Sequence, residues 1–407
     1  MVWSLSEHQT RTRSVRLLDM SGVVAEVVED SQGFAELEEE WEDLYHQSPR
    51  ATPFQSWAWL YSWWEYYGEG YELRLITVRS DEGLLVGIMP LMLERRWGLG
   101  KLLFVGTGLG DYLDVIVRAG WEDKVCESGM QATKKMDCWR IADLQQLRPD
   151  AAAWGIHRWW NGPRIGLWQD SCPVVEVKPW DELLASLSRN LRSTARRALR
   201  RAEADGLQRK IADASNIKQA AQRLVALHRE AWQGRNIGSE HLTQRFEAFT
   251  VAAAERLAYQ RLGTISELWQ DEEVLSSSFL IFGRGYCGSY ILGASQRALK
   301  QYQWSSLYIW DAVEIALGRG SSYLDLLRGE EAYKLRWSSR TIPTHRLILG
   351  PHRTAWMPYA GYHALRSRAK QYARSESAPL WVKSALVKHR TLRRRLKKSW
   401  DILDGWL

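Results

Sequence analysis

The alternation of apolar and polar residues predicts the same order of elements twice along the chain. In the first round, residues 22–30 alternate with a period of two, which predicts a strand, and the acidic stretch 31–49 has the spacing of an amphipathic helix. The remaining elements predicted in this round are an aromatic helix (54–68), a hairpin (71–80 and 83–93), two short strands around a Gly-rich bend (101–120), a helix (121–135), a strand (138–144) and a connector of Trp-rich strands punctuated by Gly and Pro (149–180).

The second round begins with a long basic helix that ends at Gly206, a residue typical of helix C-termini. The elements that follow are a strand (207–213), two helices (216–232 and 240–260), a three-strand meander (263–270, 273–283 and 285–295), a helix (304–318) and two strands (321–327 and 344–350). Since both rounds read helix, hairpin strands, helix, strand, we expect a duplicated α/β fold with a mixed sheet in each half.

The length of 407 residues agrees with two such units. We expect a loosely ordered N-terminus (1–20), an N-terminal unit that serves as a scaffold (21–180), a C-terminal unit that carries the site (181–352) and a basic helical extension (353–407).

The composition is that of an ordinary globular protein, with 45% hydrophobic and 25% charged residues. No apolar run reaches the length of about 18 residues that a membrane span needs. The first 18 residues lack the apolar middle of a secretion signal. The four cysteines are widely spaced and form no metal-binding pattern, so we expect a reducing, cytoplasmic setting and no metal.

Positive charge is concentrated in two blocks, although the net charge is only +7. Residues 351–400 contain thirteen Lys or Arg and one acid, and a second basic block occupies 189–201. Such blocks favour anionic partners. The predicted helix at 380–404 has apolar residues at helical spacing with Arg and Lys between them, so it either packs on its own domain or docks on an anionic surface at the inner face of the membrane.

Aromatic residues are abundant, with 23 Trp in the chain and a dense cluster at 57–67. Aromatic faces stack on sugars, which makes a carbohydrate acceptor conceivable. The competing interpretation is core filling between the two units, because Trp buries a large area wherever it lies.

The most informative stretch is "YLDLLRGEEAYKLRW" (323–337). It starts as a buried strand that nevertheless contains Asp325, and two acids, a Tyr and a Lys follow directly after Gly329. Ligand sites in such sheets gather where strands end, so this stretch is the candidate reacting centre.

Four stretches together resemble one known family. "LSRNLRSTARRALRRAEADG" (187–206), "ALHREAW" (226–232), "GYCGSYILGAS" (285–295) and 323–337 occur in the order and at the distances seen in the CelD/BcsL-type branch of the GNAT acyltransferase superfamily. The resemblance covers roughly residues 25–350 and implies two GNAT-like units in tandem. Similar architecture occurs in the Fem-type peptidyl transferases, which use aminoacyl-tRNA.

The resemblance implies that acyl-CoA binds where two neighbouring parallel strands part. The arm-binding strand would include Tyr290, Ile291, Leu292 and Gly293, and the pyrophosphate would lie at the start of a helix near Trp304. A loop over 295–303 would cradle the phosphates; the predicted contacts of this region are Arg297, Lys300, Gln301, Ser305 and Ser306. The loop lacks the glycines usual in such sites, which leaves the acyl donor open: acetyl-CoA, another acyl-CoA or a different carrier.

Acyl transfer needs a base for the attacking amine or hydroxyl and an acid for the leaving thiolate. Asp325 is the first candidate for the base or acceptor anchor, and Glu330 is the second. Tyr333 is a candidate acid, and Lys334 could contact phosphate or stabilise developing charge. The structural alternative is an internal ion pair between Asp325 and Lys334.

Two further groups are candidates for acceptor binding. Arg192 and Arg196 lie on one stripe of the basic helix, where they either grip an anionic substrate or form a solvated face. His228 and Trp232, from the second helix of this half, either contact the acceptor or belong to the core.

The sequence therefore predicts an acyltransferase that moves an acyl group, with acetyl as the first expectation, to an amine or hydroxyl of a sugar or cell-envelope precursor. One alternative is a Fem-like transferase that uses aminoacyl-tRNA, the only case in which we expect a nucleic-acid partner. The other is a non-catalytic scaffold at the inner membrane surface.

Overall fold

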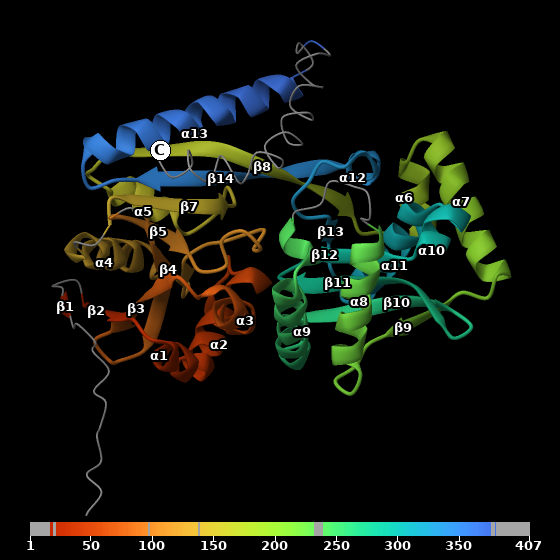
Figure 1. The fold of residues 1–407 in the computed structure, drawn as a ribbon, viewed down its shortest axis with the longest axis horizontal. Coiled ribbons are helices and arrows are strands. Elements are labelled where there is room, and N and C mark those ends of the chain that lie inside the picture. Colours follow the sequence, from red (N-terminus) through yellow and green to blue (C-terminus); the bar gives the residue numbers. More distant parts are fainter. Residues whose placement is uncertain are drawn as a thin grey trace, which may run out of the picture.

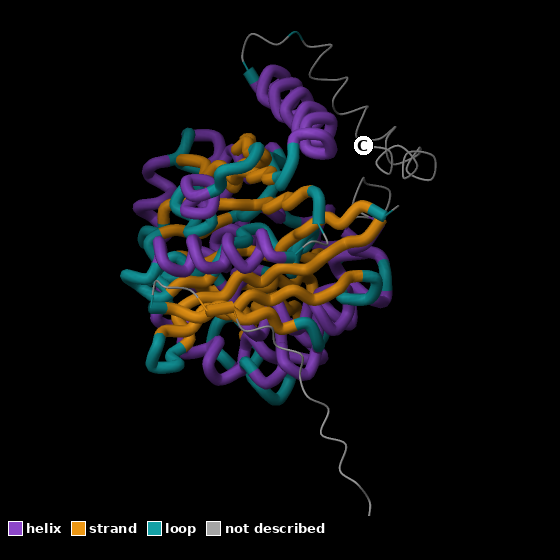
Figure 2. The backbone as a smooth tube through the Cα atoms, turned by 90° about the vertical axis from the view of Figure 1, so that its left-hand side faces the viewer, coloured by secondary structure: helices purple, strands orange, loops and turns teal. Residues whose placement is uncertain are grey.

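A computed structural model describes residues 17–18, 22–96, 98–136, 139–231, 239–375 and 379 of the chain. These residues form one mixed sheet of 14 strands with helices on both faces (Figures 1 and 2). The first half contains β1 (Leu17–Leu18), β2 (Val23–Val28), α1 (Ser31–Glu36), α2 (Glu38–Gln47), the 3₁₀ helix η1 (Pro53–Gln55), α3 (Trp57–Tyr67), β3 (Tyr71–Ser80), β4 (Leu85–Arg96), β5 (Leu99–Phe104), β6 (Ile116–Val117), α4 (Glu122–Lys135), β7 (Ile141–Leu147), α5 (Trp154–Trp159) and β8 (Arg164–Glu176).

The second half repeats this order. It contains α6 (Trp180–Ser186), α7 (Arg189–Ala204), β9 (Gln208–Ile211), α8 (Ile217–Ala231), the 3₁₀ helix η2 (Ser239–Leu242), α9 (Gln244–Tyr259), β10 (Gly263–Gln270), β11 (Glu273–Gly283), β12 (Tyr286–Ala294), α10 (Gln296–Gln301), α11 (Trp304–Gly318), β13 (Tyr323–Asp325), α12 (Ala332–Trp337), β14 (Arg340–Leu349) and α13 (Arg353–Arg374). The mixed α/β class and the duplicated order of elements predicted from the sequence are confirmed.

Local sequence signals set several helix ends. The Ser56 hydroxyl accepts a hydrogen bond from the Trp59 N–H and caps α3. Gly206 ends α7 in the left-handed region, with a φ of 70°, and the Leu207 N–H donates to the Ala202 carbonyl at 2.9 Å. Because a side chain is strained at this φ, glycine at this position closes the helix, as the sequence predicts.

Two predicted segments differ from the structure. The expected phosphate loop at 295–303 contains a short helix, α10, which Ser295 caps by accepting from the Ala298 N–H. The expected connector at 149–180 contains a strand, as predicted, but also the helix α5, and its strand β8 lies in the middle of the sheet rather than linking two separate units. Periodicity within the connector could not show this, because long-range pairing with β13 and β14 holds β8 in place.

The strand order explains how the two halves become one molecule. The path runs β1-β2-β3-β4-β5-β7-β14-β8-β13-β12-β11-β10-β9. The last strand of each half has crossed to the other: β14 lies between β7 and β8, and β8 lies between β14 and β13. Each half also contains one parallel pair, β5 with β7 and β12 with β13.

A single hydrophobic core extends across both halves on one face of the sheet. It joins α3 of the first half to α8 and α9 of the second, and includes Trp59, Tyr112, Phe249 and Ile291. On the opposite face, α4 and α5 cover the first half, while α6, α7 and α11 cover the second (Figure 1).

Helix α13 lies along β8 and β14 (Figure 1). The Ser367 hydroxyl donates to the Trp168 carbonyl of β8 at 2.7 Å. The predicted basic helix at 380–404 lies outside the described residues. Within the described part of the chain, no helix has both the length and the apolar character that crossing a bilayer requires.

Candidate active site

The parallel strands β12 and β13 part after a short stretch of pairing. They are in register at Tyr286 with Tyr323, Cys287 with Leu324, and Gly288 with Asp325. After Asp325 the chain turns toward β8, where the Leu326 N–H donates to the Pro173 carbonyl at 2.9 Å. Among the described residues, 289–294 of β12 therefore have a strand partner only on the β11 side, and a wedge opens on the other side.

A β-bulge marks the point where the wedge opens. On β12, Ser289 is opposite Leu280 and Ile291 is opposite Phe279, so Tyr290 is the extra residue. Bulges bend a strand and leave backbone groups outside the ladder, and they are frequent next to active sites. The side chain of Tyr290 packs edge-on against Trp59 of the first half, with ring centroids 4.8 Å apart.

The ladder determines which backbone groups of β12 face the wedge. The Ser295 N–H donates to the Leu275 carbonyl at 2.9 Å, so this pair points toward β11. Because orientation alternates along an antiparallel strand, Gly293 and Ile291 also point toward β11, whereas Leu292 and Ala294 point into the wedge. Of the predicted arm-binding residues, Leu292 therefore has the orientation needed to pair with a ligand.

His228 of α8 forms a hydrogen bond with one of these wedge-facing backbone groups. Its Nδ1 lies 2.7 Å from the Leu292 carbonyl oxygen. Burial lowers the pKa of His228, so the ring is neutral near pH 7 and Nδ1 carries the hydrogen that it donates to this carbonyl. Gly293 allows this approach, because a Cβ there would lie 2.6 Å from the His228 backbone nitrogen. His228 is thus a buried residue that also contacts the candidate arm-binding strand.

Asp325 lies where the two strands separate and is 1% exposed. Its carboxylate accepts hydrogen bonds from the Tyr112 hydroxyl of the first half at 2.7 Å and from the Leu327 N–H at 2.8 Å. Burial raises the pKa of Asp325 to about 6, while these two hydrogen bonds act in the opposite direction. A carboxyl with this pKa exchanges a proton near neutral pH, as a general base must.

The turn after Asp325 has a strained backbone. Leu327 has a φ of 56° and Gly329 a φ of 121°. A branched residue in the left-handed region costs roughly 1–2 kcal/mol, and such residues cluster at functional sites. The hydrogen bond from the Leu327 N–H to Asp325 stabilises this turn, so the same carboxylate shapes the loop that follows it.

The other predicted catalytic residues lie around this turn. Glu330 forms an ion pair with Arg374 of α13 at 2.6 Å. The Lys334 ammonium donates to the Arg328 carbonyl at 2.9 Å and lies 3.2 Å from Glu331, so the alternative in which it pairs with Asp325 is not observed.

Tyr333 lies on the opposite face of the sheet from Asp325, next to a residue that the sequence did not single out. Its ring packs edge-on against Tyr308 of α11, with centroids 6.2 Å apart. The Tyr308 hydroxyl lies beside the Ser289 side chain, where β12 leaves β13. Burial raises the pKa of both phenols, so both remain protonated at neutral pH and could donate a proton. Only the tertiary proximity to Ser289 identifies Tyr308, because its immediate neighbours in α11, Leu307 and Ile309, are apolar.

The start of α11 is the candidate phosphate-binding end of the wedge. The helix begins at Trp304, as predicted, and its preceding residue Gln303 makes no side-chain cap. Ser305 and Ser306 lie within the first turn; the Ser306 hydroxyl is buried and has no hydrogen-bond partner in the described part of the chain. Free N–H groups at a helix start favour anions.

The predicted phosphate contacts on α10 differ in their exposure and in their partners. Lys300 and Gln301 are exposed. Arg297 forms an ion pair with Glu273 and donates to the Gln270 side chain, so it is held to the β10–β11 turn. A cation that the sequence did not select, Arg201 of α7, lies over the ring of Tyr302 at 5.4 Å, two residues before α11 begins.

Two of the four predicted acceptor contacts, Arg192 and Arg196, lie on α7. Arg192 donates to the Ala185 and Leu187 carbonyls at 3.1 and 3.0 Å and thereby caps α6. Arg196 is exposed and lies 3.8 Å from Asp181. Trp232 lies outside the described residues. The described residues include no cluster of three or more His, Cys, Asp or Glu side chains placed to hold a metal ion.

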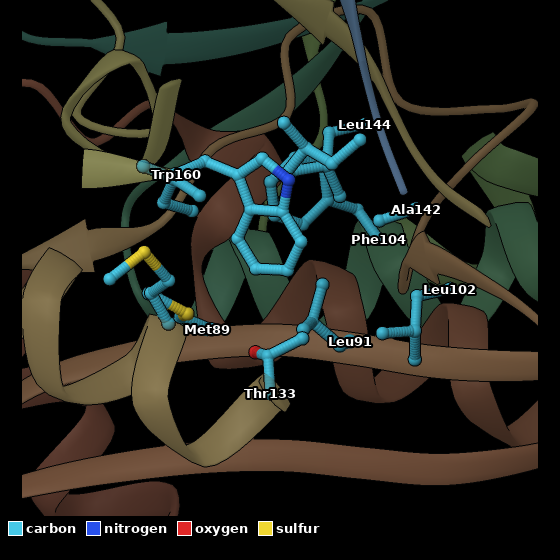
Figure 3. Close-up of a pocket in the computed structure, with 11 residues that line it drawn as sticks. Met89, Leu91, Leu102, Phe104, Thr133, Ala142, Leu144 and Trp160 are labelled. Atoms are coloured by element: carbon cyan, nitrogen blue, oxygen red, sulfur yellow. The ribbon is translucent and has the colours of Figure 1, made fainter. Parts of the chain in front are cut away.

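The corresponding gap in the first half is filled with apolar side chains. Strands β5 and β7 pair only at Lys101 with Ile141 and at Leu102 with Ala142. Beyond them lies a cavity of only about 20 Å³, lined by the Trp160 indole and by mainly apolar side chains (Figure 3). Room for one or two water molecules is too little for a thioester arm.

Comparisons with known proteins agree with this geometry. Residues 189–335 match the model of the acetyltransferase (GNAT) domain, a region that contains the wedge, α11 and the turn after Asp325. A search of curated proteins finds no significant match.

Several solved structures have a similar fold over most of the chain. The crystal structure of FemX matches with a TM-score of 0.55 and 12% identity, covering 76% of this chain and 95% of that one. L-PGS from Bacillus licheniformis gives 0.52 and 11%, covering 81% and 95%. The C-terminal domain of a putative lysylphosphatidylglycerol synthetase from Agrobacterium fabrum gives 0.52 and 12%, covering 82% and 96%. At these identities the likeness shows the fold alone, and the expected tandem GNAT-like architecture is confirmed.

Proposed function

We propose that this protein is an acyltransferase that moves an acyl group from acyl-CoA to an amine or hydroxyl of a sugar or cell-envelope precursor. The observation that carries the proposal is the wedge between β12 and β13, which opens at the Tyr290 bulge and has the start of α11 nearby. The match of 189–335 to the GNAT domain and the acyltransferase-like fold support the reaction class. The acceptor class and the CelD/BcsL branch rest on the sequence resemblance.

In this proposal the second half carries the chemistry and the first half is a scaffold. The pantetheine arm of the donor pairs with the Leu292 N–H and with the backbone groups of Ala294 that face the wedge, since the Leu292 carbonyl already accepts from His228. Its pyrophosphate lies at the start of α11, where the N–H groups of the first turn, Lys300 and Arg201 supply positive charge. The apolar filling around Trp160 leaves too little room for a thioester arm, which supports the assignment of the first half as a scaffold.

The proposed chemistry is direct transfer. Asp325 takes the proton from the attacking amine or hydroxyl, whose lone pair forms a bond to the thioester carbonyl carbon. The carbon–sulfur bond then breaks, and the leaving thiolate receives a proton from Tyr333 or Tyr308 on the other face of the wedge. Because the Tyr112 hydroxyl covers Asp325, the acceptor must displace Tyr112 or receive a hydrogen bond from it.

Calorimetry with acetyl-CoA and longer acyl-CoAs tests the proposal. We expect micromolar binding to the wild-type protein and at least about ten-fold weaker binding to Arg201→Gln, since Arg201 lies beside the start of α11. Arg189→Gln is the matched control, because it removes an exposed arginine at the far end of the same helix. Absence of binding to any acyl-CoA would overturn the assignment of the donor.

A second candidate is aminoacyl transfer from tRNA, and a specific observation favours it. The segment at the donor site is helical and without glycine, and the fold matches FemX and the lysylphosphatidylglycerol synthetase domain. A tRNA donor would meet the exposed Arg196, Arg197 and Arg200 of α7. Protection of aminoacyl-tRNA from hydrolysis, together with no acyl-CoA binding, would select this candidate.

We also infer that α13 brings the protein to an anionic membrane surface. Residues 353–374 contain five Arg or Lys and no acid. Met357, Leu365 and Tyr372 are 59%, 70% and 51% exposed, and their spacing of eight and seven residues places them on one outward stripe. An exposed apolar stripe with positive charge suits an anionic bilayer. This surface is compatible with an enzyme that acts on envelope precursors and with the scaffold alternative.

A further inference from the structure

A second cavity lies beneath α13, away from the wedge. It has a volume of about 100 Å³ and lies between α13 and the strands β8 and β14. Its lining consists of Leu167, Trp168, Gln169, Asp170, Arg346, His363, Arg366, Ser367 and Lys370. One ordered water needs roughly 10–15 Å³, so this cavity, the α13 pocket, has room for an ion with four oxygens.

The pocket and its immediate surroundings carry excess positive charge. Arg346, Arg366 and Lys370 line it, and Asp170 is its one lining carboxylate. Arg374 lies directly beside it, 4.5 Å from the Trp168 ring. Lys370 forms an ion pair with Asp170, and Arg374 lies 3.9 Å from the same carboxylate, so two cations share one acid.

Asp143, the other acid near Arg346, is already engaged. Its Oδ2 accepts from the Tyr359 hydroxyl and from the Gln145 amide, each at 2.8 Å. Its Oδ1 lies 3.0 Å from Arg346 Nε, but neither atom has a partner in hydrogen-bonding geometry. Glu330 forms an ion pair with Arg374, so the four cations face three carboxylates among the described residues, a formal excess of one positive charge.

Two guanidinium nitrogens near the pocket are buried without an acceptor among the described residues: Arg346 Nε and Arg374 Nη1. A buried donor without an acceptor costs roughly 1–3 kcal/mol, and more when it is charged. His363 contacts Arg346 Nη1 through its ring nitrogens and adds no negative charge. Burial, followed by the neighbouring Arg346, lowers the pKa of His363 to about 3, so the ring is neutral.

We propose that the α13 pocket binds a small oxyanion, either phosphate or the phosphate group of a larger molecule. Arginine forks match the oxygens of phosphate, and the lysine supplies a further point charge. An oxyanion here would offer acceptors to the guanidinium groups and balance the excess charge.

The ligand would also act on the turn after Asp325. Arg374 holds Glu330 of that turn at 2.6 Å, so a bound anion that draws on Arg374 links α13 to the candidate active site. The pocket proposal does not depend on which acyl donor the wedge accepts.

Calorimetry with inorganic phosphate at constant ionic strength tests the proposal. We expect millimolar or tighter binding to the wild-type protein, at least ten-fold weaker binding to Arg366→Gln and Lys370→Gln, and less than a two-fold change for Arg368→Gln. Arg368 is exposed on the same helix and does not line the pocket, so it is the matched control. Equal binding by all four proteins, or no binding at 10 mM phosphate, would overturn the proposal.

An additional variant changes affinity in the opposite direction. Asp170→Asn removes the carboxylate that competes for Lys370 and Arg374, so we expect phosphate to bind at least three-fold more tightly. A misfolded protein would not gain affinity, which keeps this result separate from a loss of folding. Unchanged or weaker binding by a folded Asp170→Asn protein would contradict the proposal.

Vesicles distinguish the source of the phosphate. If a lipid headgroup occupies the pocket, inorganic phosphate should displace the protein from phosphatidylglycerol vesicles, and Arg366→Gln should bind them less than Arg368→Gln does. If the ligand is a free ion, phosphate should bind the protein equally with and without vesicles. Either result supports an oxyanion site and identifies where the oxyanion comes from.

Discussion

Asp325 holds two neighbours at once: the Tyr112 hydroxyl from the first half and the Leu327 N–H in its own turn. This arrangement ties the two halves together and surrounds the carboxyl to which we assign the proposed proton transfer. Its raised pKa shows that the environment disfavours the charged form, despite both hydrogen bonds. If Asp325 served stability alone, a neutral side chain would be the more stable choice at this buried position. Replacement by Asn keeps the shape and removes the charge, so it separates a structural role from a catalytic one.

Asp325→Asn should lower kcat/KM by at least about 100-fold, because the amide cannot accept a proton. Its amide group can still donate to the Tyr112 oxygen and accept from the Leu327 N–H, so we expect the melting temperature to change by only a few degrees. For the wild-type enzyme, kcat/KM should fall as the pH drops below about 6, where Asp325 becomes protonated. Steady-state kinetics across pH 4.5–8.5 measures both effects, and normal turnover by the variant would remove Asp325 from the mechanism.

The same group makes stability depend on pH with a defined sign. Asp325 has a pKa near 6 in the folded protein and an ordinary value of 3.8 when exposed, so the folded state binds the extra proton between these values. Its stabilising contribution is complete below pH 3.8 and is lost as the pH rises through 6, by roughly 3 kcal/mol at most. Relative to the wild type, Asp325→Asn should therefore gain stability as the pH rises from 4 to 7. Urea unfolding at both pH values measures the difference. A loss of stability by Asp325→Asn relative to the wild type between pH 4 and pH 7 would contradict this assignment.

At the scale of elements, the close contact between α8 and β12 positions the candidate arm-binding strand. Gly293 faces the backbone of α8, where an added Cβ would lie 2.6 Å from the His228 nitrogen and 2.8 Å from the Leu224 carbonyl oxygen. Since these are backbone atoms, the helix would have to move away. Movement of α8 would also break the bond from His228 to the Leu292 carbonyl.

Gly293→Ala should destabilise the protein by about 1–3 kcal/mol, the usual cost of overpacking. It should also weaken binding of the acyl donor, because the wedge edge of β12 changes. Gly361→Ala is the control: Gly361 lies on the exposed side of α13 with no atom within 4 Å of the added Cβ, so alanine there should stabilise by about 0.5–1 kcal/mol. Chemical denaturation of both variants checks the prediction, which is wrong if the two changes have the same sign.

At the scale of the whole molecule, the exchange of β8 and β14 makes the halves inseparable. Each strand completes the sheet of the other half, and the shared core continues the connection on one face. Because α13 packs along these same strands, its packing surface depends on both halves being assembled. In the proposed membrane contact, its outward stripe is the surface that would present the wedge to the bilayer.

The double variant Met357→Glu/Leu365→Glu should bind phosphatidylglycerol vesicles at least about five-fold more weakly, because both changes place charge on the outward stripe. Tyr259→Glu is the matched control, since Tyr259 is 86% exposed on α9 and lies outside that stripe. Co-sedimentation with vesicles at low and high salt measures the effect, and binding should weaken with salt. Equal binding by all three proteins would remove α13 from the interaction.

The sequence by itself determined the order of the elements, the duplication, the cap at Gly206 and the ionisable turn after Asp325. These features depend on local periodicity and on single-residue conformational preferences, which act over a few residues. The resemblance added the tandem fold. The four predicted catalytic residues lie within one short stretch, so their spacing in the sequence already placed them near the same turn.

Only the tertiary structure decided which partners those residues meet. It placed β8 and β14 across the two halves, covered Asp325 with Tyr112, paired Glu330 with Arg374 and brought Tyr308 to Ser289. It also turned the expected phosphate loop into a helix and formed the α13 pocket from residues about 200 positions apart. Strand pairing and side-chain burial join segments that are distant in the chain, and their energies depend on those distant partners, so no local pattern contains them.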